Sequence, residues 1–237
     1  MSSDQTFVII GAGQAGGWAA KTLRDQGFEG RVVIVGDEDF APHERPPLSK
    51  EVLLGDAEKE SCLLWPPGTL EEADIEMHLG VSVKSIDADG HTMSLSNGET
   101  LAWNKLLIAT GGRARSLDVD GVDLDGVYTL RTIEDAEGIR ARLTAGAKVL
   151  VIGAGWIGLE VAAAARKRDA SATVVEVADR VCARALTEDM SQWVHALHER
   201  HGVDFRLTTA FSHFAGEEKL EKAVLGDGSE IDCDVAV

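Results

Sequence analysis

The chain has 237 residues, enough for two modest domains, and its apolar fraction of 44% is ordinary for a globular protein. Acidic residues outnumber basic ones by 40 to 23, and the formal net charge of −17 disfavours nucleic acid and anionic membranes as partners. No apolar run reaches the roughly 20 residues of a membrane span, and no basic segment precedes the first apolar run. We therefore expect a cytoplasmic protein without a membrane segment.

An apolar run over residues 7–10 predicts the first buried parallel strand, and a predicted helix follows it to about Gln26. Between the two lie Gly11, Gly13 and Gly16, spaced G-x-G-x-x-G. The first glycine of this motif permits a tight turn, the second lets a pyrophosphate approach the backbone, and the third lets helix and strand pack closely. The free N–H groups at the helix start then hold the phosphate charge. The motif predicts a dinucleotide-binding unit.

A second strand is predicted over residues 31–35, and Asp37 follows it. Asp37 lies about 20 residues beyond the last glycine of the motif, where a carboxylate accepts hydrogen bonds from a ribose. The alternative role for this residue is to cap a turn or helix. Its position after a strand end favours ribose binding.

The stretch 40–50 contains Pro46 and Pro47, which exclude regular structure there. We expect Ser49 to cap a short helix that follows. A proline-stiffened loop that ends in Lys50 suits the fixed presentation of a charge, whereas a solvated lysine is the usual alternative.

Polar and apolar residues alternate over 81–103, with turn residues between the segments, which predicts an antiparallel meander. An apolar strand over 106–109 then ends in Thr110 and Gly111, a turn that brings the backbone close to a ligand. The acidic, glycine-rich stretch after it reads as a connection between domains. We predict domains at 1–115 and 116–237, with residues 116–126 as the connecting segment.

The glycine motif recurs after an apolar run over 149–152 and again leads into a helix. Two copies with the same flanks indicate two dinucleotide-binding units. Glu176 lies in the next predicted strand, 173–177, and is 18 residues past Gly158, the distance expected for an acid that binds the adenosine ribose and repels a 2′-phosphate. This favours NADH over NADPH, although Arg180 lies nearby in the sequence. The second motif consists of Gly153, Gly155 and Gly158.

A helix is predicted over 188–201, where three histidines share one face but no acid or cysteine completes a metal site. Strand-like segments at 203–207, 221–225 and 231–237 predict a second antiparallel insert. The predicted fold is α/β, with two Rossmann-type domains that each carry a small antiparallel insert. The three cysteines, which we expect to be free and inert in a reducing compartment, are Cys62, Cys182 and Cys233.

Five segments in order, FVIIGAGQAG, VGDEDFAPHERPPLSK, LLIATGGRAR, YTLRTIEDA and VLVIGAGWIGLE, resemble the FAD-dependent NADH–ferredoxin reductases. These enzymes belong to the pyridine nucleotide-disulfide oxidoreductase superfamily and feed aromatic-ring dioxygenases and some cytochrome monooxygenases. The resemblance spans nearly the whole chain, and RPPLSK together with two Rossmann repeats is its specific part. Members of the family continue well beyond residue 237, with a second FAD-binding segment and a C-terminal domain.

The resemblance implies that the first unit binds FAD and the second binds NADH, and it assigns residues to each cofactor. The FAD contacts carried over are Gly11, Gly13, Ala15, Gly16, Asp37, Arg45, Lys50, Val83, Thr110, Gly111 and Arg131. Those for NADH are Gly153, Gly155, Ile157, Gly158, Glu176 and Arg184. Lys50 and Glu160 match a lysine–glutamate pair that lies beside the flavin in the family. Trp156, within the second motif, either lines the nicotinamide pocket or packs between domains.

The implied function is transfer of electrons from NADH through FAD to a ferredoxin-type iron–sulfur protein. The disulfide branch of the superfamily carries a redox C-x-x-x-x-C soon after the first glycine motif, and this chain has none. Electrons must therefore leave directly from the flavin. One alternative is an enzyme of the same fold with rubredoxin, oxygen, a quinone or nitrite as acceptor. The other is a nucleotide-binding sensor without turnover.

Overall fold

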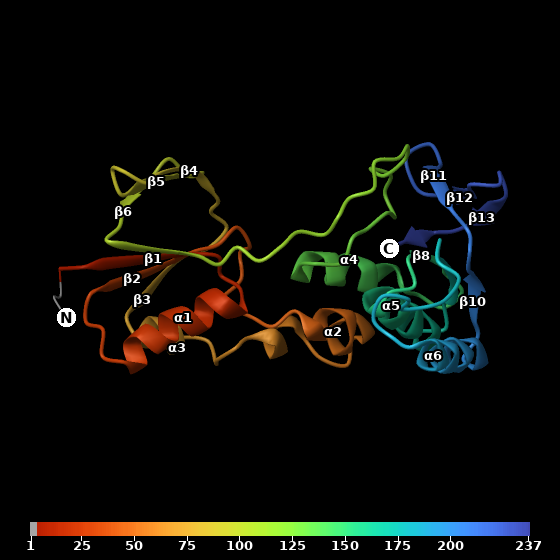
Figure 1. Ribbon diagram of the computed structural model, residues 1–237, viewed down its shortest axis with the longest axis horizontal. Coiled ribbons are helices and arrows are strands. Elements are labelled where there is room, and N and C mark those ends of the chain that lie inside the picture. Colours follow the sequence, from red (N-terminus) through yellow and green to blue (C-terminus); the bar gives the residue numbers. More distant parts are fainter. Residues whose placement is uncertain (1–3) are drawn as a thin grey trace. The chain divides into compact units, whose positions relative to one another are not determined.

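The computed structural model describes residues 4–237, which form two compact units (Figure 1). The first contains the residues up to Glu44 together with Glu60–Arg113, and the second contains Arg45–Lys59 and Ala114–Val237. The end of the first unit lies close to the predicted boundary at residue 115. Residues 45–59, however, pack with the second unit, whereas their place in the sequence assigned them to the first domain.

The first unit is built on a four-stranded parallel sheet of order β3-β2-β1-β7. Its strands are β1 (Thr6–Ile10), β2 (Arg31–Val35), β3 (Ile75–His78) and β7 (Lys105–Ile108). The helix α1 (Gln14–Asp25) connects β1 to β2, as predicted. The strand β3 was not predicted, because only Ile75 of its four residues is fully buried and no apolar run marks it.

Different elements cover the two faces of this sheet (Figure 1). On one face α1 and the short helix α3 (Thr69–Glu72) pack over Ile9, Val32 and Ile34. On the other face lies the predicted meander, whose Met93 and Leu95 pack against Val8 and its neighbours. The meander consists of β4 (Val83–Asp87), β5 (Thr92–Leu95) and β6 (Thr100–Ala102). Alternating side chains of the buried strands thus supply both cores.

The second unit repeats this plan with a parallel sheet of order β10-β9-β8-β14. The strands are β8 (Lys148–Ile152), β9 (Ser171–Val175), β10 (Val203–Arg206) and β14 (Val235–Ala236). Its longer helices are α4 (Ile133–Arg142), α5 (Trp156–Lys167) and α6 (Glu188–Arg200). The segment 45–59 contributes a 3₁₀ turn, η1 (Pro46–Ser49), and the short helix α2 (Glu51–Leu54). Leu53 of α2 is fully buried among residues of α4 and α5.

The second antiparallel insert exists, but its composition differs from the prediction. It consists of β11 (Phe211–Ala215), β12 (Lys222–Leu225) and β13 (Glu230–Asp232). Residues 203–207 were assigned to it wrongly, because β10 pairs parallel with β9 after the crossover through α6. The end of the chain also returns to the parallel sheet, where β14 pairs with β8. Strand periodicity alone does not distinguish an edge strand of one sheet from the first strand of the next.

The three cysteines are buried. Cys62 lies in the 3₁₀ turn η2 (Lys59–Cys62), and burial raises the pKa of the Cys233 thiol to about 12. Among residues 4–237, no helix is both long and apolar enough to cross a lipid bilayer. Within the same residues, no cluster of three or more histidine, cysteine or carboxylate side chains forms a metal site.

Candidate dinucleotide-binding sites

The first glycine loop follows β1, and each glycine has a distinct environment. Gly11 has φ +115°, and a Cβ there would lie 2.2 Å from the carbonyl oxygen of Ala109. A Cβ on Gly16 would lie 1.9 Å from the oxygen of Gly11, so the helix and the turn meet without room for a side chain. Space around the Cβ position of Gly13 is open. The loop therefore leaves its middle glycine accessible to a ligand, as a pyrophosphate site requires.

Parallel pairing brings other predicted FAD residues to this edge of the first sheet. Ile10 pairs with Val35 and with Ile108, so the residues after β1, β2 and β7 lie at one end. Asp37 is exposed after β2, and Thr110 and Gly111 are exposed after β7. Ala15 is exposed in the first turn of α1, and half-buried Val83 begins β4. These residues form the carboxyl edge where α/β sheets bind ligands.

Three residues predicted to contact FAD belong to the second unit instead. They are Arg45, Lys50 and Arg131. Arg45 donates a hydrogen bond to the backbone oxygen of Arg131 at 2.6 Å. The Nε atom of Arg131 is buried and has no hydrogen-bond partner among residues 4–237. A buried donor of this kind is consistent with an anionic ligand that would satisfy it.

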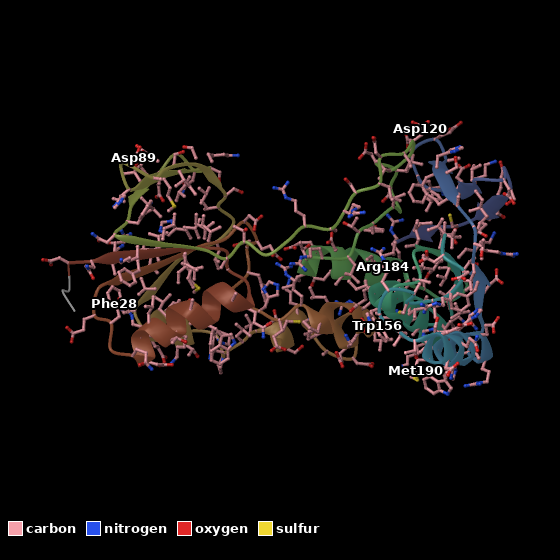
Figure 2. The ribbon with its side chains drawn as sticks, viewed as in Figure 1. Phe28, Asp89, Asp120, Trp156, Arg184 and Met190 are labelled. Carbon is pink, nitrogen blue, oxygen red and sulfur yellow. The ribbon has the colours of Figure 1, made fainter. Side chains whose placement is uncertain are left out.

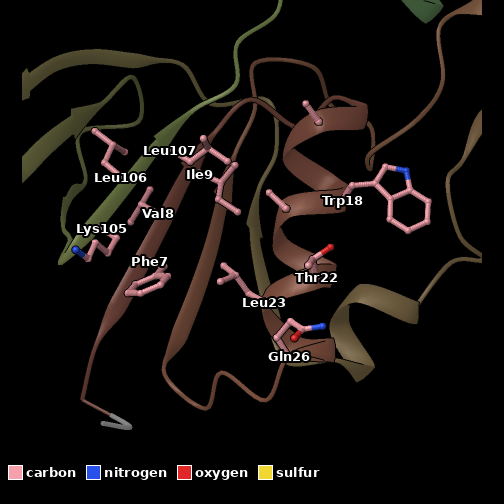
Figure 3. Close-up of a pocket in the computed structure, with 12 residues that line it drawn as sticks. Phe7, Val8, Ile9, Trp18, Thr22, Leu23, Gln26, Lys105, Leu106 and Leu107 are labelled. Atoms are coloured by element: carbon pink, nitrogen blue, oxygen red, sulfur yellow. The ribbon is translucent and has the colours of Figure 1, made fainter. Parts of the chain in front are cut away.

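An apolar hollow of about 530 Å³ lies between α1 and the strands β1 and β7 (Figure 3). Trp18, Leu23 and Leu107 line it, and Trp18 is 49% exposed. Ala15 reaches its rim, but Gly11, Gly13 and Gly16 do not line it. The hollow is therefore separate from the phosphate site that the glycine loop predicts.

The second glycine loop follows β8 with the same turn. Gly153 has φ +107°, and its N–H donates to the backbone oxygen of Val175 at 2.8 Å. Gly155 is the N-cap of α5, and the space around its Cβ position is open. A Cβ on Gly158 would lie 2.1 Å from the oxygen of Gly153, so only glycine fits there. The geometry predicted from the spacing is present in both units.

Glu176 lies directly after β9, and its carboxylate contacts the loop itself. One oxygen accepts the backbone N–H of Ala154 at 2.8 Å, and the other accepts the N–H of Ala178 at 2.8 Å. Because each carboxylate oxygen has two lone-pair sites, both oxygens keep capacity for further donors such as ribose hydroxyls. Glu176 therefore fixes the glycine turn and still presents a negative charge beside it.

A cleft of about 820 Å³ opens beside the second glycine loop, and several of its lining residues were predicted to contact NADH. Trp156 and Ile157, at the start of α5, are each 52% exposed and line the cleft together with Arg184. Trp156 and Arg184 are labelled in Figure 2. Gly153, Gly155 and Gly158 also line it. Glu176 does not line this cleft and contacts the loop through Ala154.

Arg180 is bound within its own loop. Its guanidinium donates to the backbone oxygens of Ala183 at 2.8 Å and Leu186 at 3.0 Å. A 2′-phosphate beside Glu176 would have to compete with these carbonyl groups for the guanidinium. These two hydrogen bonds use two of the five N–H donors of the guanidinium and tie it to its own loop.

Lys50 and Glu160, predicted as a pair, contact each other within the second unit. The Lys50 Nζ atom lies 3.0 Å from Glu160 Oε1, and the two side chains are 44% and 29% exposed. Ser49 was predicted to cap a helix, but this was wrong: α2 has no side-chain cap. The Ser49 hydroxyl instead donates to Glu160 Oε2 at 2.5 Å. No sequence signal links residues that lie 111 positions apart.

Known proteins match this chain over nearly its whole length. A family profile described as pyridine nucleotide-disulphide oxidoreductase matches residues 5–237. The probable ferredoxin reductase CtmF of Castellaniella defragrans is 37% identical over 100% of this chain and 58% of its own length. The ferredoxin–NAD(+) reductase subunit of a benzene 1,2-dioxygenase system from Pseudomonas putida is 40% identical over 97% and 56%.

Among solved structures, the covalent complex of putidaredoxin reductase with putidaredoxin matches with a TM-score of 0.95 and 37% identity. That match covers 99% of this chain and 58% of the other. The likeness confirms the predicted fold class of two Rossmann-type units with antiparallel inserts. The chain spans little more than half the length of these relatives.

Proposed function

Because the chain belongs to the pyridine nucleotide-disulphide oxidoreductase family, we propose that it passes electrons from NADH through FAD to a ferredoxin-type iron–sulfur protein. The observation that carries the proposal is the same glycine turn in both units, each at the carboxyl edge of a parallel sheet. The relatives add support, since several are named as ferredoxin reductase components of dioxygenase systems. The downstream enzyme would then be a ring-hydroxylating dioxygenase or a similar oxygenase.

The residues of the first unit fit FAD. The open space at Gly13 leaves backbone N–H groups accessible to a pyrophosphate at the start of α1. The exposed Asp37 carboxylate would accept hydrogen bonds from the adenosine ribose. Thr110 and Gly111 would contact the cofactor at the end of β7. From the second unit, Arg45 and Arg131 would supply positive charge.

The residues of the second unit fit NADH. Gly155 would admit the pyrophosphate to the N-terminus of α5, and Trp156 and Ile157 would form an apolar wall of the cleft. Glu176 would accept the ribose hydroxyls and repel a 2′-phosphate, which gives the preference for NADH over NADPH. Arg184, on the cleft, would contact the bound nucleotide.

When bound, FAD would supply the chemistry of accepting a hydride from NADH and releasing electrons singly. Lys50 would provide positive charge where reduction leaves negative charge on the flavin. Glu160 would orient that ammonium through their contact at 3.0 Å. The sequence has no C-x-x-x-x-C after the first glycine motif, which supports direct delivery of electrons to the partner protein. We also propose a cytoplasmic location, since the three cysteines of the sequence are far apart and have no paired spacing.

The test uses the complete protein, purified with FAD and reduced by NADH without oxygen in a stopped-flow instrument. We expect Lys50→Ala and Glu160→Ala to slow flavin bleaching by roughly 10²-fold, the usual effect of removing one group that stabilises developing charge. Lys59→Ala is the matched control, because Lys59 forms a similar exposed ion pair with Glu137 in the same unit. Bleaching that is equally fast in Lys50→Ala and Lys59→Ala would disprove the role of Lys50.

The acceptor is tested separately with the reduced protein. We expect rapid electron transfer to a ferredoxin and slow transfer to rubredoxin, a quinone, nitrite or oxygen. A colourless protein that binds NADH without any redox change would instead identify a nucleotide sensor.

A further inference from the structure

Ser49 is a buried hydroxyl in the segment 45–59 whose main partner is Glu160. Ser49 is the last residue of η1 and is 7% exposed. The hydroxyl donates to Glu160 Oε2 at 2.5 Å and lies 3.4 Å from the Pro46 carbonyl oxygen. A hydrogen bond between a hydroxyl and a carboxylate is short and about twice as strong as one between neutral groups. Glu160 is therefore the dominant partner of this hydroxyl.

The consecutive residues Ser49 and Lys50 thus each bind one oxygen of the Glu160 carboxylate. Ser49 binds Oε2, and Lys50 Nζ lies 3.0 Å from Oε1. Because both oxygens lie in one plane, fixing Oε2 also fixes the direction in which Oε1 faces the ammonium. An ion pair between two partly exposed side chains has little orientational preference by itself. The buried hydroxyl supplies that preference.

The backbone that carries Ser49 is itself held in place. Pro46 and Pro47 restrict φ within η1, and the Lys50 N–H donates to the Pro47 oxygen at 3.0 Å. Beyond η1, Leu53 is fully buried, and Arg168 donates to the Leu54 oxygen at 2.7 Å. Ser49 therefore approaches Glu160 from a rigid support. The exposed Lys50 ammonium also donates to the Pro46 oxygen at 3.3 Å.

We propose that Ser49 is a positioning residue for the proposed reduction of the flavin, acting by holding the Glu160 carboxylate toward Lys50. Ser49 does not itself contact the reacting atoms in this scheme. The inference rests on the proposed function, because it concerns the lysine–glutamate pair assigned there. It goes beyond that assignment by naming the group that orients the pair.

The experiment compares Ser49→Ala and Ser49→Thr in the complete FAD-containing protein, each with wild-type Glu160 and with Glu160→Ala. We expect Ser49→Ala to slow flavin reduction by about tenfold, in keeping with the loss of one hydrogen bond to a charged group. The NADH concentration for half-saturation should stay unchanged, since the nucleotide cleft is intact. Ser49→Thr, which keeps the hydroxyl, should recover the rate. With Glu160→Ala present, Ser49→Ala should cause no further loss.

A second readout does not depend on turnover. Acetylation of Lys50 by isotope-labelled acetic anhydride, measured by mass spectrometry, reports how firmly its ammonium is held. We expect Ser49→Ala to raise the acetylation of Lys50 several-fold and to leave that of Lys59 unchanged. Glu160→Ala should raise the acetylation of Lys50 at least as much as Ser49→Ala does.

Two results would overturn the inference. One is an equal effect of Ser49→Ala on the rate in both Glu160 backgrounds, which would mean that Ser49 acts on the fold rather than through Glu160. The other is unchanged acetylation of Lys50 in Ser49→Ala while Glu160→Ala raises it. A normal rate in Glu160→Ala would contradict the proposed role of the pair, and the acetylation data would still decide whether Ser49 orients it.

Discussion

The two glycine loops have the same spacing and the same turn, but different contacts hold them. Gly11 and Gly153, the first glycine of each motif, both have φ above +100°. A Cβ on Gly11 would lie 2.2 Å from the backbone oxygen of Ala109, which directly follows β7. The turn in the first unit therefore packs against the chain at the end of β7, and the turn in the second unit is bonded to the Glu176 carboxylate.

The acids that follow the second strand of each unit differ in their hydrogen bonds. Asp37 is exposed beside the first loop, but Glu176 is bonded through both oxygens to backbone N–H groups, one of them within the second loop. The first turn is therefore held by packing against a strand and the second by a carboxylate. Similar motifs reach the same turn through different supporting contacts, and this difference makes each unit vulnerable to different substitutions.

The largest expected effect comes from replacing the first glycine of the first motif. Gly11→Ala combines an unfavourable φ, about 1–3 kcal/mol, with a backbone clash of about 1–3 kcal/mol. Hydrogen–deuterium exchange of the first unit should therefore show a clear loss of stability for Gly11→Ala. Gly13→Ala, at an open position with φ −85°, is the control. Equal losses for Gly11→Ala and Gly13→Ala would show that the close approach to Ala109 has no consequence.

An intermediate effect is expected from the two acids. Glu176→Ala removes the acceptor of two backbone N–H groups and should destabilise the second unit by about 1–3 kcal/mol. It should also narrow the preference for NADH over NADPH. Asp37→Ala, at an exposed position, should change stability by less than about 0.5 kcal/mol and weaken FAD retention. Unfolding midpoints and nucleotide titrations measure both effects, and an unaltered NADH to NADPH ratio in Glu176→Ala would contradict its assignment.

The smallest expected effect is a dependence of stability on pH. It arises because the connections that follow β2 and β9 differ. The second unit crosses from β9 to β10 through the long helix α6, whereas the connection from β2 to β3 contains only short helical segments such as α2 and α3. Burial, together with nearby His201 and His195, lowers the pKa of His198 on α6 below 6.5. The unfolded chain then binds the proton more readily, so the stability of the second unit should fall as pH decreases below about 6.5.

His198→Gln should flatten this pH dependence, and His213→Gln on β11 provides the comparison. Chemical unfolding at several pH values between 5 and 8 measures the slope. If the stability of the first unit fell with pH at the same slope, the effect could not be assigned to His198 on α6.

The sequence by itself determined the two turns, the acids after the second strands, the first meander and helices such as α1. These features depend on neighbours within a few residues, such as a glycine spacing or an alternating pattern. The resemblance to a family added the pairing of Lys50 with Glu160, which local patterns alone could not supply.

Only the tertiary structure decided where residues 45–59 pack, which sheet β10 joins, and what Ser49 does. Each depends on a contact across a long stretch of chain, such as Ser49 with Glu160 at 111 residues or Leu54 with Arg168 at 114. Burial of Leu53 against α4 and α5 draws the proline segment onto the second unit, although its sequence lies within the first. Packing of apolar surface between distant segments, rather than local preference, sets such contacts.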